Sequence, residues 1–304
     1  MEEKNHLYED VIKNTEHGFY ELDEKYRRTM DDFYRDEYYQ KEHALYQHIE
    51  YDKIDIVNKN NLYAQKMYVF DKWVNMADTR SLSMLDIGTG EGYALKYFSD
   101  NGWKVVGVDF SIYGIEAHNP SMKPFFMQGD FYELIKGFEK ERRIFDFINA
   151  DNVLEHLTEP KKFFESVRKV SNDRTILCVT VPNDFSLIQK KAVEMGHVEE
   201  AFWVTKDTSE HFNYFSVDSL CSLGNSEGFE KIIATSDWPI DFFLLNKNTN
   251  YKKDSMAGHD CHVACTLLEN AIYENSMEKA VTLFGSLADA GVGREISVYF
   301  RQKK

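Results

Sequence analysis

The sequence predicts an α/β protein built on a doubly wound, mostly parallel sheet with a ligand at the carboxyl ends of its strands. The stretch MLDIGTGEGYALKYF (84–98) joins an apolar segment typical of a buried strand to a glycine-rich turn and a helical pattern. The segments 103–111 and 125–133 repeat this plan, and their apolar residues end at Asp109 and at the pair Gly129–Asp130. A strand, a glycine or acid, and then a helix is the unit from which open α/β sheets build a nucleotide site.

Further strand patterns complete the sheet. They lie at 144–150, 175–183, 230–236 and 295–302. Counting strands from residue 84, we expect the order 3-2-1-4-5-7-6, with the seventh strand antiparallel. Helical spacing predicts a helix over 60–76, before the first strand, and another over 213–229, which Gly228 ends.

The chain divides into a core and additions to it. The core comprises residues 81–183, 213–236 and 294–304. Residues 1–80 are expected to form a helical N-terminal extension that acts as a lid. The segments 184–212 and 237–293 are longer than the connections of such a sheet require, and long ordered insertions usually carry function. We therefore expect these two insertions to cap the site.

Composition narrows the class of protein. With 304 residues the chain can bury one large α/β core with additions. A formal net charge of −15 argues against a nucleic-acid partner, because such proteins carry a basic face. No apolar run reaches the roughly 18 residues of a membrane span, and residues 1–10 lack the apolar segment of a signal peptide. The four cysteines are too few for a disulfide scaffold, so we expect a cytoplasmic protein.

The glycine loop indicates which ligand is bound. Gly88, Gly90 and Gly92 are spaced G-x-G-x-G, which differs from the G-x-G-x-x-G of dinucleotide sites. Asp86 before the loop and Glu91 within it would repel a pyrophosphate, but they suit a ligand with a cationic amino group and a sulfonium. The stretch resembles motif I of the class I S-adenosylmethionine-dependent methyltransferases. Thr89 stands where many relatives have Cys, which is harmless if the backbone makes the contact.

This resemblance implies a Rossmann-like fold, S-adenosylmethionine as cofactor and a set of contacts to it. An acid at the end of the second strand binds the ribose hydroxyls, a role that falls to Asp109. The acid after the third strand, Asp130 or its neighbour, contacts the adenine amino group. The expected cofactor residues are Asp86, Gly88, Gly90, Gly92, Asp109, Phe110, Gly129, Asp130, Phe131, Ala150 and Asp151.

A narrower resemblance concerns the acceptor of the methyl group. The segments VPNDFS (181–186), EHFNYFS (210–216) and GVGREI (291–296) are similar to those of bacterial methyltransferases of surface-polysaccharide and activated-sugar pathways. This similarity implies O-methylation of an activated sugar or a phosphorylated precursor. A homodimer is compatible with the sequence, which does not determine the oligomeric state.

Methyl transfer to a hydroxyl requires an in-line displacement and a group that removes the proton. Histidine titrates near neutral pH, and two histidines are candidates for this base. His156 follows the fourth strand, and His211 ends the first insertion. Either histidine could instead be structural or orient the substrate. Residues expected to contact the acceptor are Tyr38, Tyr39, Asn183, Asn213 and Tyr214.

Alternatives remain open at this point. An N-methyltransferase acting on an amino-sugar or amine would need no such base. A non-catalytic subunit that binds S-adenosylmethionine would use the insertions as partner surfaces. An NAD-linked dehydrogenase is disfavoured by the loop spacing. The segment GHDCHVAC (258–265) contains potential metal ligands, but their spacing is not that of a zinc site, and we expect no metal.

Overall fold

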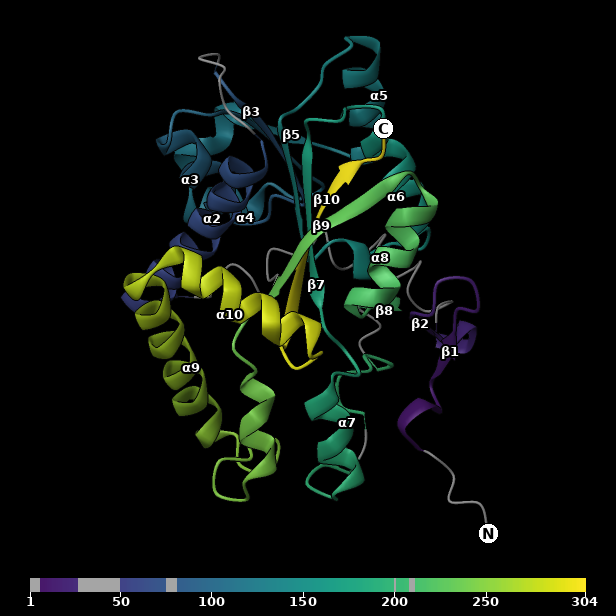
Figure 1. The fold of residues 1–304 in the computed structure, drawn as a ribbon, viewed down its shortest axis with the longest axis vertical. Coiled ribbons are helices and arrows are strands. Elements are labelled where there is room, and N and C mark those ends of the chain that lie inside the picture. Colours follow the sequence, from purple (N-terminus) through teal and green to yellow (C-terminus); the bar gives the residue numbers. More distant parts are fainter. Residues whose placement is uncertain (1–5, 27–49, 75–80, 200, 208–210) are drawn as a thin grey trace.

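A computed structural model of the chain describes residues 6–26, 50–74, 81–199, 201–207 and 211–304. Its centre is a seven-stranded sheet (Figure 1). The strands lie in the order β5 (Phe126–Gln128), β4 (Lys104–Asp109), β3 (Ser83–Ile87), β6 (Phe147–Asp151), β7 (Ile176–Pro182), β10 (Glu295–Gln302) and β9 (Phe229–Ser236). β10 is antiparallel to both neighbours, whereas β3 to β7 pair in parallel. The predicted strand order and antiparallel seventh strand are confirmed.

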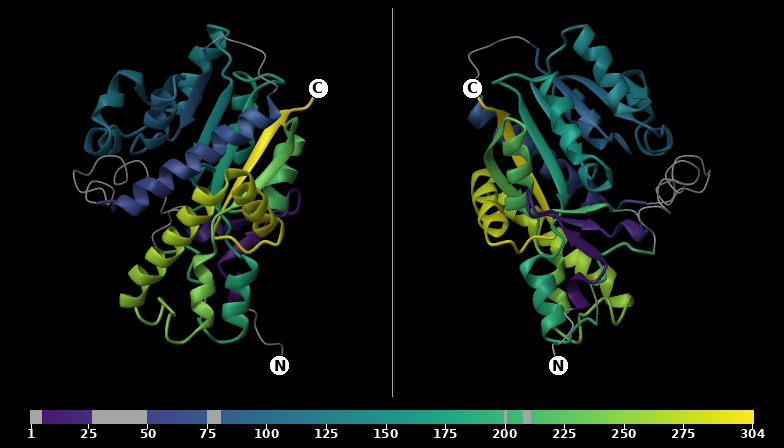
Figure 2. Two further views of the ribbon diagram at one scale, coloured as in Figure 1. Left: turned by 60° about the vertical axis from the view of Figure 1, so that its left-hand side comes forward. Right: turned by 90° about the vertical axis from the view of Figure 1, so that its right-hand side faces the viewer.

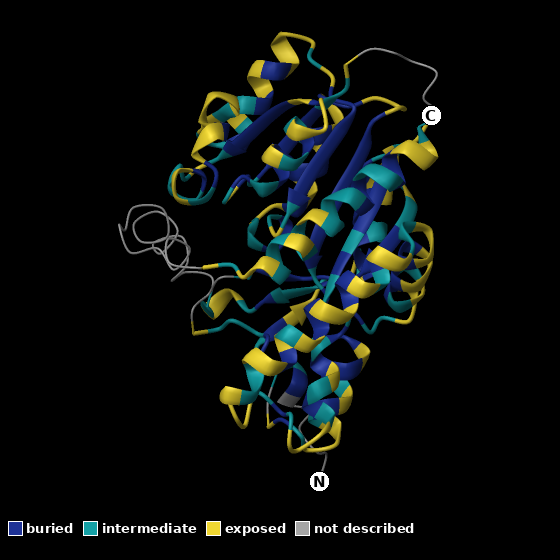
Figure 3. Ribbon diagram, turned by 90° about the vertical axis from the view of Figure 1, so that its left-hand side faces the viewer, coloured by how far each residue is buried: buried dark blue, intermediate teal, exposed yellow. Residues whose placement is uncertain are grey.

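Helices cover both faces of this sheet. The helices of the described residues are α2 (Lys53–Trp73), α3 (Tyr93–Asp100), α4 (Tyr113–His118), α5 (Phe131–Lys140), α6 (Pro160–Arg168), α7 (Leu187–Glu194), α8 (Val217–Ser226), α9 (Met256–Asn275) and α10 (Met277–Asp289), with short 3-10 helices η1 (His6–Tyr8), η4 (Pro120–Phe125), η5 (Leu154–His156) and η6 (Ile240–Leu245). Figure 3 shows the strands buried between helices whose outer faces are exposed. Among the described residues, no helix has the length and apolar character that crossing a membrane requires.

Alternation along the strands produces two cores, one on each face of the sheet. In β10, Val298 and Phe300 belong to the core under α5, α6 and α8, whereas Tyr299 between them joins the opposite core. That second core also contains Phe70 of α2 and Phe98 of α3. Successive strand residues point to opposite faces, so a strand buried on both sides is apolar at most of its positions. The result is a three-layer arrangement, visible from two further directions in Figure 2.

The N-terminal extension contains strands as well as helix. β1 (Val11–Lys13) and β2 (Tyr20–Leu22) form an antiparallel pair, and β2 also pairs with β8 (Asn213–Tyr214). The helix predicted from residue 213 begins later, at Val217, because the Ser216 side chain accepts a hydrogen bond from the Ser219 amide and caps it. The predicted helix over 60–76 is α2, which begins earlier than expected.

α7 and α9, one from each insertion, lie beyond the carboxyl ends of the parallel strands (Figure 1). α7 follows β7 directly, and its Ala192 packs against Leu244 of η6. α9 lies along α2, where Asn61 Nδ2 donates to Asn270 Oδ1 at 2.9 Å. The first insertion therefore contacts the second, and the second contacts α2.

Candidate active site

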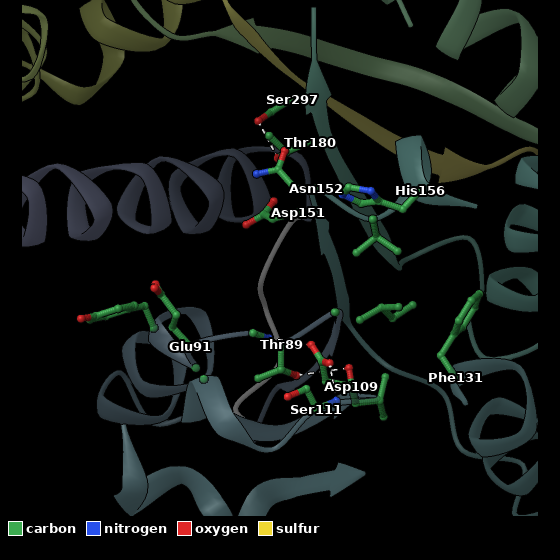
Figure 4. A pocket seen from close by; sticks show the side chains of 18 of the residues that line it. Thr89, Glu91, Asp109, Ser111, Phe131, Asp151, Asn152, His156, Thr180 and Ser297 are labelled. Atoms are coloured by element: carbon green, nitrogen blue, oxygen red, sulfur yellow. Dashed lines mark hydrogen bonds between the residues drawn. The ribbon is translucent and has the colours of Figure 1, made fainter. Parts of the chain in front are cut away.

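The carboxyl ends of the parallel strands open into a cavity of about 730 Å³. It is lined by the loops that follow β3, β4, β5 and β6, by one face of α2, and by residues of β7, β9 and β10. The predicted cofactor residues that line it are Gly88, Gly90, Gly92, Asp109, Phe110, Gly129, Asp130, Phe131 and Asp151. In Figure 4, Asp109 and Ser111 lie at one end of the cavity and Thr180, Asn152 and Ser297 at the other.

The glycine loop has a backbone that other residues would not adopt easily. Gly88, Gly90 and Gly92 have φ values of +72°, +51° and +78°. A Cβ atom at Gly88 would also lie only 2.4 Å from Cγ2 of Val153, on the loop after β6. Glycine avoids both the strain and the collision, so the loop can present bare backbone to a ligand.

Asp109, at the end of β4, holds the glycine loop from one side of the cavity. Its Oδ2 accepts a hydrogen bond from the Gly90 amide at 2.8 Å, and its Oδ1 accepts one from the Ser111 amide at 2.9 Å. Each carboxylate oxygen has a second lone pair, so both can also accept from a ligand. This geometry suits a pair of ribose hydroxyls, the role predicted for Asp109.

The predicted adenine end lies beyond Asp109. Asp130 caps α5 by accepting a hydrogen bond from the Glu133 amide at 3.0 Å. Phe131 is buried, whereas Phe110 lies exposed at the edge of the cavity. Two aromatic rings and a carboxylate with spare lone pairs provide apolar contact and a hydrogen-bond acceptor, the combination that an adenine ring with its amino group requires.

Asp86 and Ala150, both predicted to contact the cofactor, are buried in the sheet and do not line the cavity. Asp86 accepts a hydrogen bond from Asn149 Nδ2 at 2.8 Å. Burial raises the pKa of Asp86 to about 7. Asn149 Nδ2 also lies 3.1 Å from Oδ2 of Asp151, so Asn149 links Asp86 to a residue that lines the cavity.

The charged group nearest this network is one that the sequence did not reveal, Lys66 of α2. Its Nζ donates to Asp151 Oδ2 at 2.6 Å and to Asn149 Oδ1 at 2.8 Å. Burial opposes the charge on Lys66, but Asp151 more than offsets it and raises the pKa of Lys66 above its ordinary value. Burial also opposes the charge on Asp151, but the nearby Lys66 outweighs burial and lowers the pKa of Asp151 below its ordinary value. The sequence signals Lys66 in one way only: this lysine lies three residues before Val69, on the face of α2 that packs against the sheet.

Glu91 bonds to the protein as well as facing the cavity. It accepts a hydrogen bond from the Tyr51 hydroxyl at 2.7 Å, and Lys59 Nζ lies 3.5 Å from its other oxygen. His118 Nε2 is 3.6 Å away. These contacts tie the start of α2 to the glycine loop, so Glu91 offers less of its charge to a ligand than the sequence argument assumed.

The two candidate bases, far apart in the sequence, are neighbours in the structure. The ring centroids of His156 and His211 are 5.0 Å apart, at an interplanar angle of 73°. The Phe212 amide donates to the Glu155 carbonyl at 2.8 Å, which joins the segment before β8 to η5. His156 lines the cavity, whereas His211 lies behind it. From the sequence, His156 and His211 were alternative candidates for the base, whereas in the structure they lie next to each other.

Three of the five residues predicted to bind the acceptor can be placed in the structure, and none of the three lines the cavity. Asn183, Asn213 and Tyr214 are buried and do not line the cavity. Asn213 Nδ2 donates to the Leu157 carbonyl at 2.7 Å, and Asn183 Nδ2 donates to the Gly293 carbonyl at 2.8 Å, so both hold loops in place. Tyr38 and Tyr39 lie outside the described residues.

Other polar groups line the far end of the cavity. The hydroxyls of Thr180 and Ser297 lie 2.8 Å apart on adjacent strands, β7 and β10. Asn152, Asp237 and Glu295 also line the cavity. Among the described residues, the potential ligand residues of 258–265 form no metal-binding group. His262 Nε2 instead lies 2.8 Å from Asp55 Oδ1 of α2.

Comparison with known proteins identifies the family. Residues 58–234, more than half of the chain, match the methyltransferase domain family. The chain belongs to this family of methyltransferases. Together with the G-x-G-x-G loop and the acid at the end of β4, this membership makes S-adenosylmethionine the cofactor of this methyltransferase, as the sequence predicts.

Solved structures resemble this methyltransferase in outline. An S-adenosylmethionine-dependent methyltransferase from Archaeoglobus fulgidus is 15% identical, with a TM-score of 0.49 over 80% of this chain and 94% of that chain. The 1,6-didemethyltoxoflavin-N1-methyltransferase of Burkholderia thailandensis is 10% identical, with a TM-score of 0.49 over 97% and 100% of the two chains. The search of curated proteins finds no match. Similarities this distant do not identify the acceptor.

Proposed function

We propose that this methyltransferase transfers a methyl group from S-adenosylmethionine to a hydroxyl of a sugar or related small polar precursor of a cell-surface polysaccharide. The observation that carries the proposal is that one cavity joins the glycine loop and Asp109 to His156 and to the hydroxyls of Thr180 and Ser297. Its volume of about 730 Å³ lies within the usual range for ligand sites. The link to polysaccharides rests on the resemblance of 181–186, 210–216 and 291–296.

We place the activation of the hydroxyl at the pair formed by His156 and His211. A sugar hydroxyl is a poor nucleophile until its proton is leaving, and an imidazole at hydrogen-bond distance can take that proton near neutral pH. His156 faces the cavity, and His211 supports it from behind. The four cysteines are free thiols, which supports the cytoplasmic setting proposed for the reaction.

A second candidate, methylation of an amine or amino-sugar, is favoured by the charge of the cavity. Both lysines of its lining are already paired, Lys59 with Glu91 and Lys66 with Asp151. Within the described part of the chain neither Asp237 nor Glu295 forms an ion pair with a lysine, and burial raises the pKa of each carboxyl group. An ammonium group beside these carboxyl groups would favour their ionised form and pair with it, whereas a phosphate would oppose their ionisation. We therefore expect any phosphate of the acceptor to lie outside this end.

The test combines a panel of acceptors with two variants. Purified protein and S-adenosylmethionine are incubated with nucleotide-linked sugars, amino-sugars and small amines, and products are screened by mass for the gain of one methyl group. For a hydroxyl acceptor we expect His156→Ala and His211→Ala to lower turnover at least tenfold while affinity for S-adenosylhomocysteine is retained.

The outcomes separate the candidates. An amine acceptor whose methylation persists in both variants at high pH would favour N-methylation, since a neutral amine needs no base. Tight binding of S-adenosylmethionine with no product from any acceptor class would favour a non-catalytic binding subunit. Equal turnover of a hydroxyl acceptor by the wild type and both variants would contradict the role given to the histidine pair.

A further inference from the structure

Three side chains with metal-ligating atoms meet where η5 contacts the segment before β8. They are the carboxylate of Glu155 and the imidazoles of His156 and His211, and one ligand atom of each lies within 4.8 Å of the other two. Glu155 Oε1 is 3.7 Å from His156 Nε2. Three atoms at this spacing surround a common point about 2.8 Å or less from each. Modest side-chain rotation would bring them to the roughly 2.0–2.2 Å at which nitrogen and carboxylate oxygen bind zinc.

Two members of this cluster lack the partners that buried polar groups normally have. Glu155 is only 1% exposed, and neither carboxylate oxygen accepts a hydrogen bond within the described part of the chain. Nδ1 of His211 is buried and likewise has no hydrogen-bond partner there. Most buried polar atoms in proteins are hydrogen-bonded, so these exceptions require an explanation. His211 Nδ1 also lies 3.8 Å from Asp184 Oδ2. A cation between the Glu155 carboxylate and the two imidazoles would give the unpartnered oxygens of Glu155 a partner.

We propose that Glu155, His156 and His211 bind one divalent transition-metal ion of the zinc type. Imidazole nitrogen is a ligand for zinc, iron, copper and nickel, whereas magnesium and calcium prefer oxygen ligands alone. Two histidines and one carboxylate make three protein ligands, the number found in catalytic zinc sites that keep a position open. We place the open position on the side of His156, the one of the three ligands that lines the cavity.

The effect on catalysis rests on the proposed function, whereas the binding of the ion does not. An acceptor hydroxyl bound at the open position would have a lowered pKa, as water does on zinc. The hydroxyl would release its proton to solvent, and its oxygen would then form the bond to the methyl carbon as the sulfur–carbon bond of the cofactor breaks. In the loaded protein His156 would serve as a ligand and the ion would take over activation of the acceptor.

The experiment is a titration of the full chain after treatment with a chelator. Zinc and cobalt(II) are added separately, and binding is followed by calorimetry and, for cobalt, by visible absorption. We expect one equivalent to bind, with at least tenfold weaker binding by Glu155→Gln and by His211→Ala. His262→Ala is the matched control, because His262 also contacts a carboxylate, that of Asp55, but lies exposed on α9. The His262→Ala variant should still bind one equivalent of metal ion with the affinity of the wild type.

Each result decides the matter. Absence of a tight equivalent in the wild type, or unchanged affinity in both Glu155→Gln and His211→Ala, overturns the proposal. Binding of S-adenosylhomocysteine shows whether each variant is folded. If a variant does not fold, the titration of the wild type alone decides the proposal. Methylation by protein that binds no ion would leave the proposed function standing without the metal site. A bound ion without methylation of any acceptor would support the metal site and contradict the proposed function.

Discussion

Nζ of Lys66 lies 2.6 Å from Oδ2 of Asp151, and this contact joins the helix before the sheet to the end of its central strands. Asp151 ends β6, next to β3 and its glycine loop. Asn149 extends the contact by accepting from Lys66 and donating to Asp86. The position of α2 over the cavity is therefore coupled to buried charges in the sheet.

Breaking this pair should be costly. Lys66→Met leaves the Asp151 carboxylate without its cation, and loss of one partner of a buried pair costs about 3–5 kcal/mol. The double variant Lys66→Met/Asp151→Asn removes both charges and should recover part of that loss. Unfolding by urea, followed by circular dichroism, measures the free energy in each case.

Lys96→Met is the matched control for that experiment. Lys96 pairs with Asp100 on the exposed face of α3, where such a pair contributes about 0.5 kcal/mol or less. Equal losses of unfolding free energy in Lys66→Met and Lys96→Met would show that the buried pair contributes no more than a surface pair.

Gly88→Ala should destabilise the protein and weaken cofactor binding. The new Cβ would lie 2.4 Å from Cγ2 of Val153, and φ is +72° at this position. Gly102→Ala isolates the backbone strain, because φ is +84° there but no atom lies within 4 Å of the new Cβ. We expect Gly102→Ala to cost about 1–2 kcal/mol and Gly88→Ala more. The double variant Gly88→Ala/Val153→Ala should recover the difference in thermal unfolding, and a failure to do so would contradict the collision.

Asp109→Asn should lower the affinity for S-adenosylhomocysteine by about 10- to 100-fold, measured by calorimetry. The Asn side chain has one carbonyl oxygen, so it cannot hold the Gly90 and Ser111 amides and still accept from two ribose hydroxyls. Hydrogen bonds to a charged group contribute about 1.5–3 kcal/mol. Asp100→Asn, an exposed change of the same kind, should have no effect. Affinity within twofold of the wild type would remove Asp109 from the ribose site.

Asp86 should make stability depend on pH. Burial raises its pKa from 3.8 to about 7, so between about pH 4 and pH 7 the folded protein holds a proton that the unfolded chain has lost. The contribution of Asp86 therefore lowers stability as pH rises through that window. Relative to the wild type, Asp86→Asn should gain unfolding free energy between pH 5 and about pH 8. A difference that shrinks over the same range would have the wrong sign.

The sequence by itself determined the sheet, its strand order, the glycine loop and the cofactor. β10 (Glu295–Gln302) has the predicted bounds, because alternation of residues over eight positions is a local pattern. Gly88, Gly90 and Gly92 mark the loop because their backbone conformations are ones that only glycine adopts without strain. Such signals lie within a few residues of one another, so they can be recognised without knowledge of the fold.

Only the tertiary structure decided how the site is assembled. His156 and His211 became neighbours through the contact of Phe212 with η5, and Lys66 met Asp151 because α2 packs on the sheet. Burial leaves Asp86 outside the lining of the cavity. Each of these outcomes depends on packing between segments distant in the sequence, where the cost of leaving a charge unpaired selects its partner. The pattern of residues along the chain does not show which distant segments come into contact.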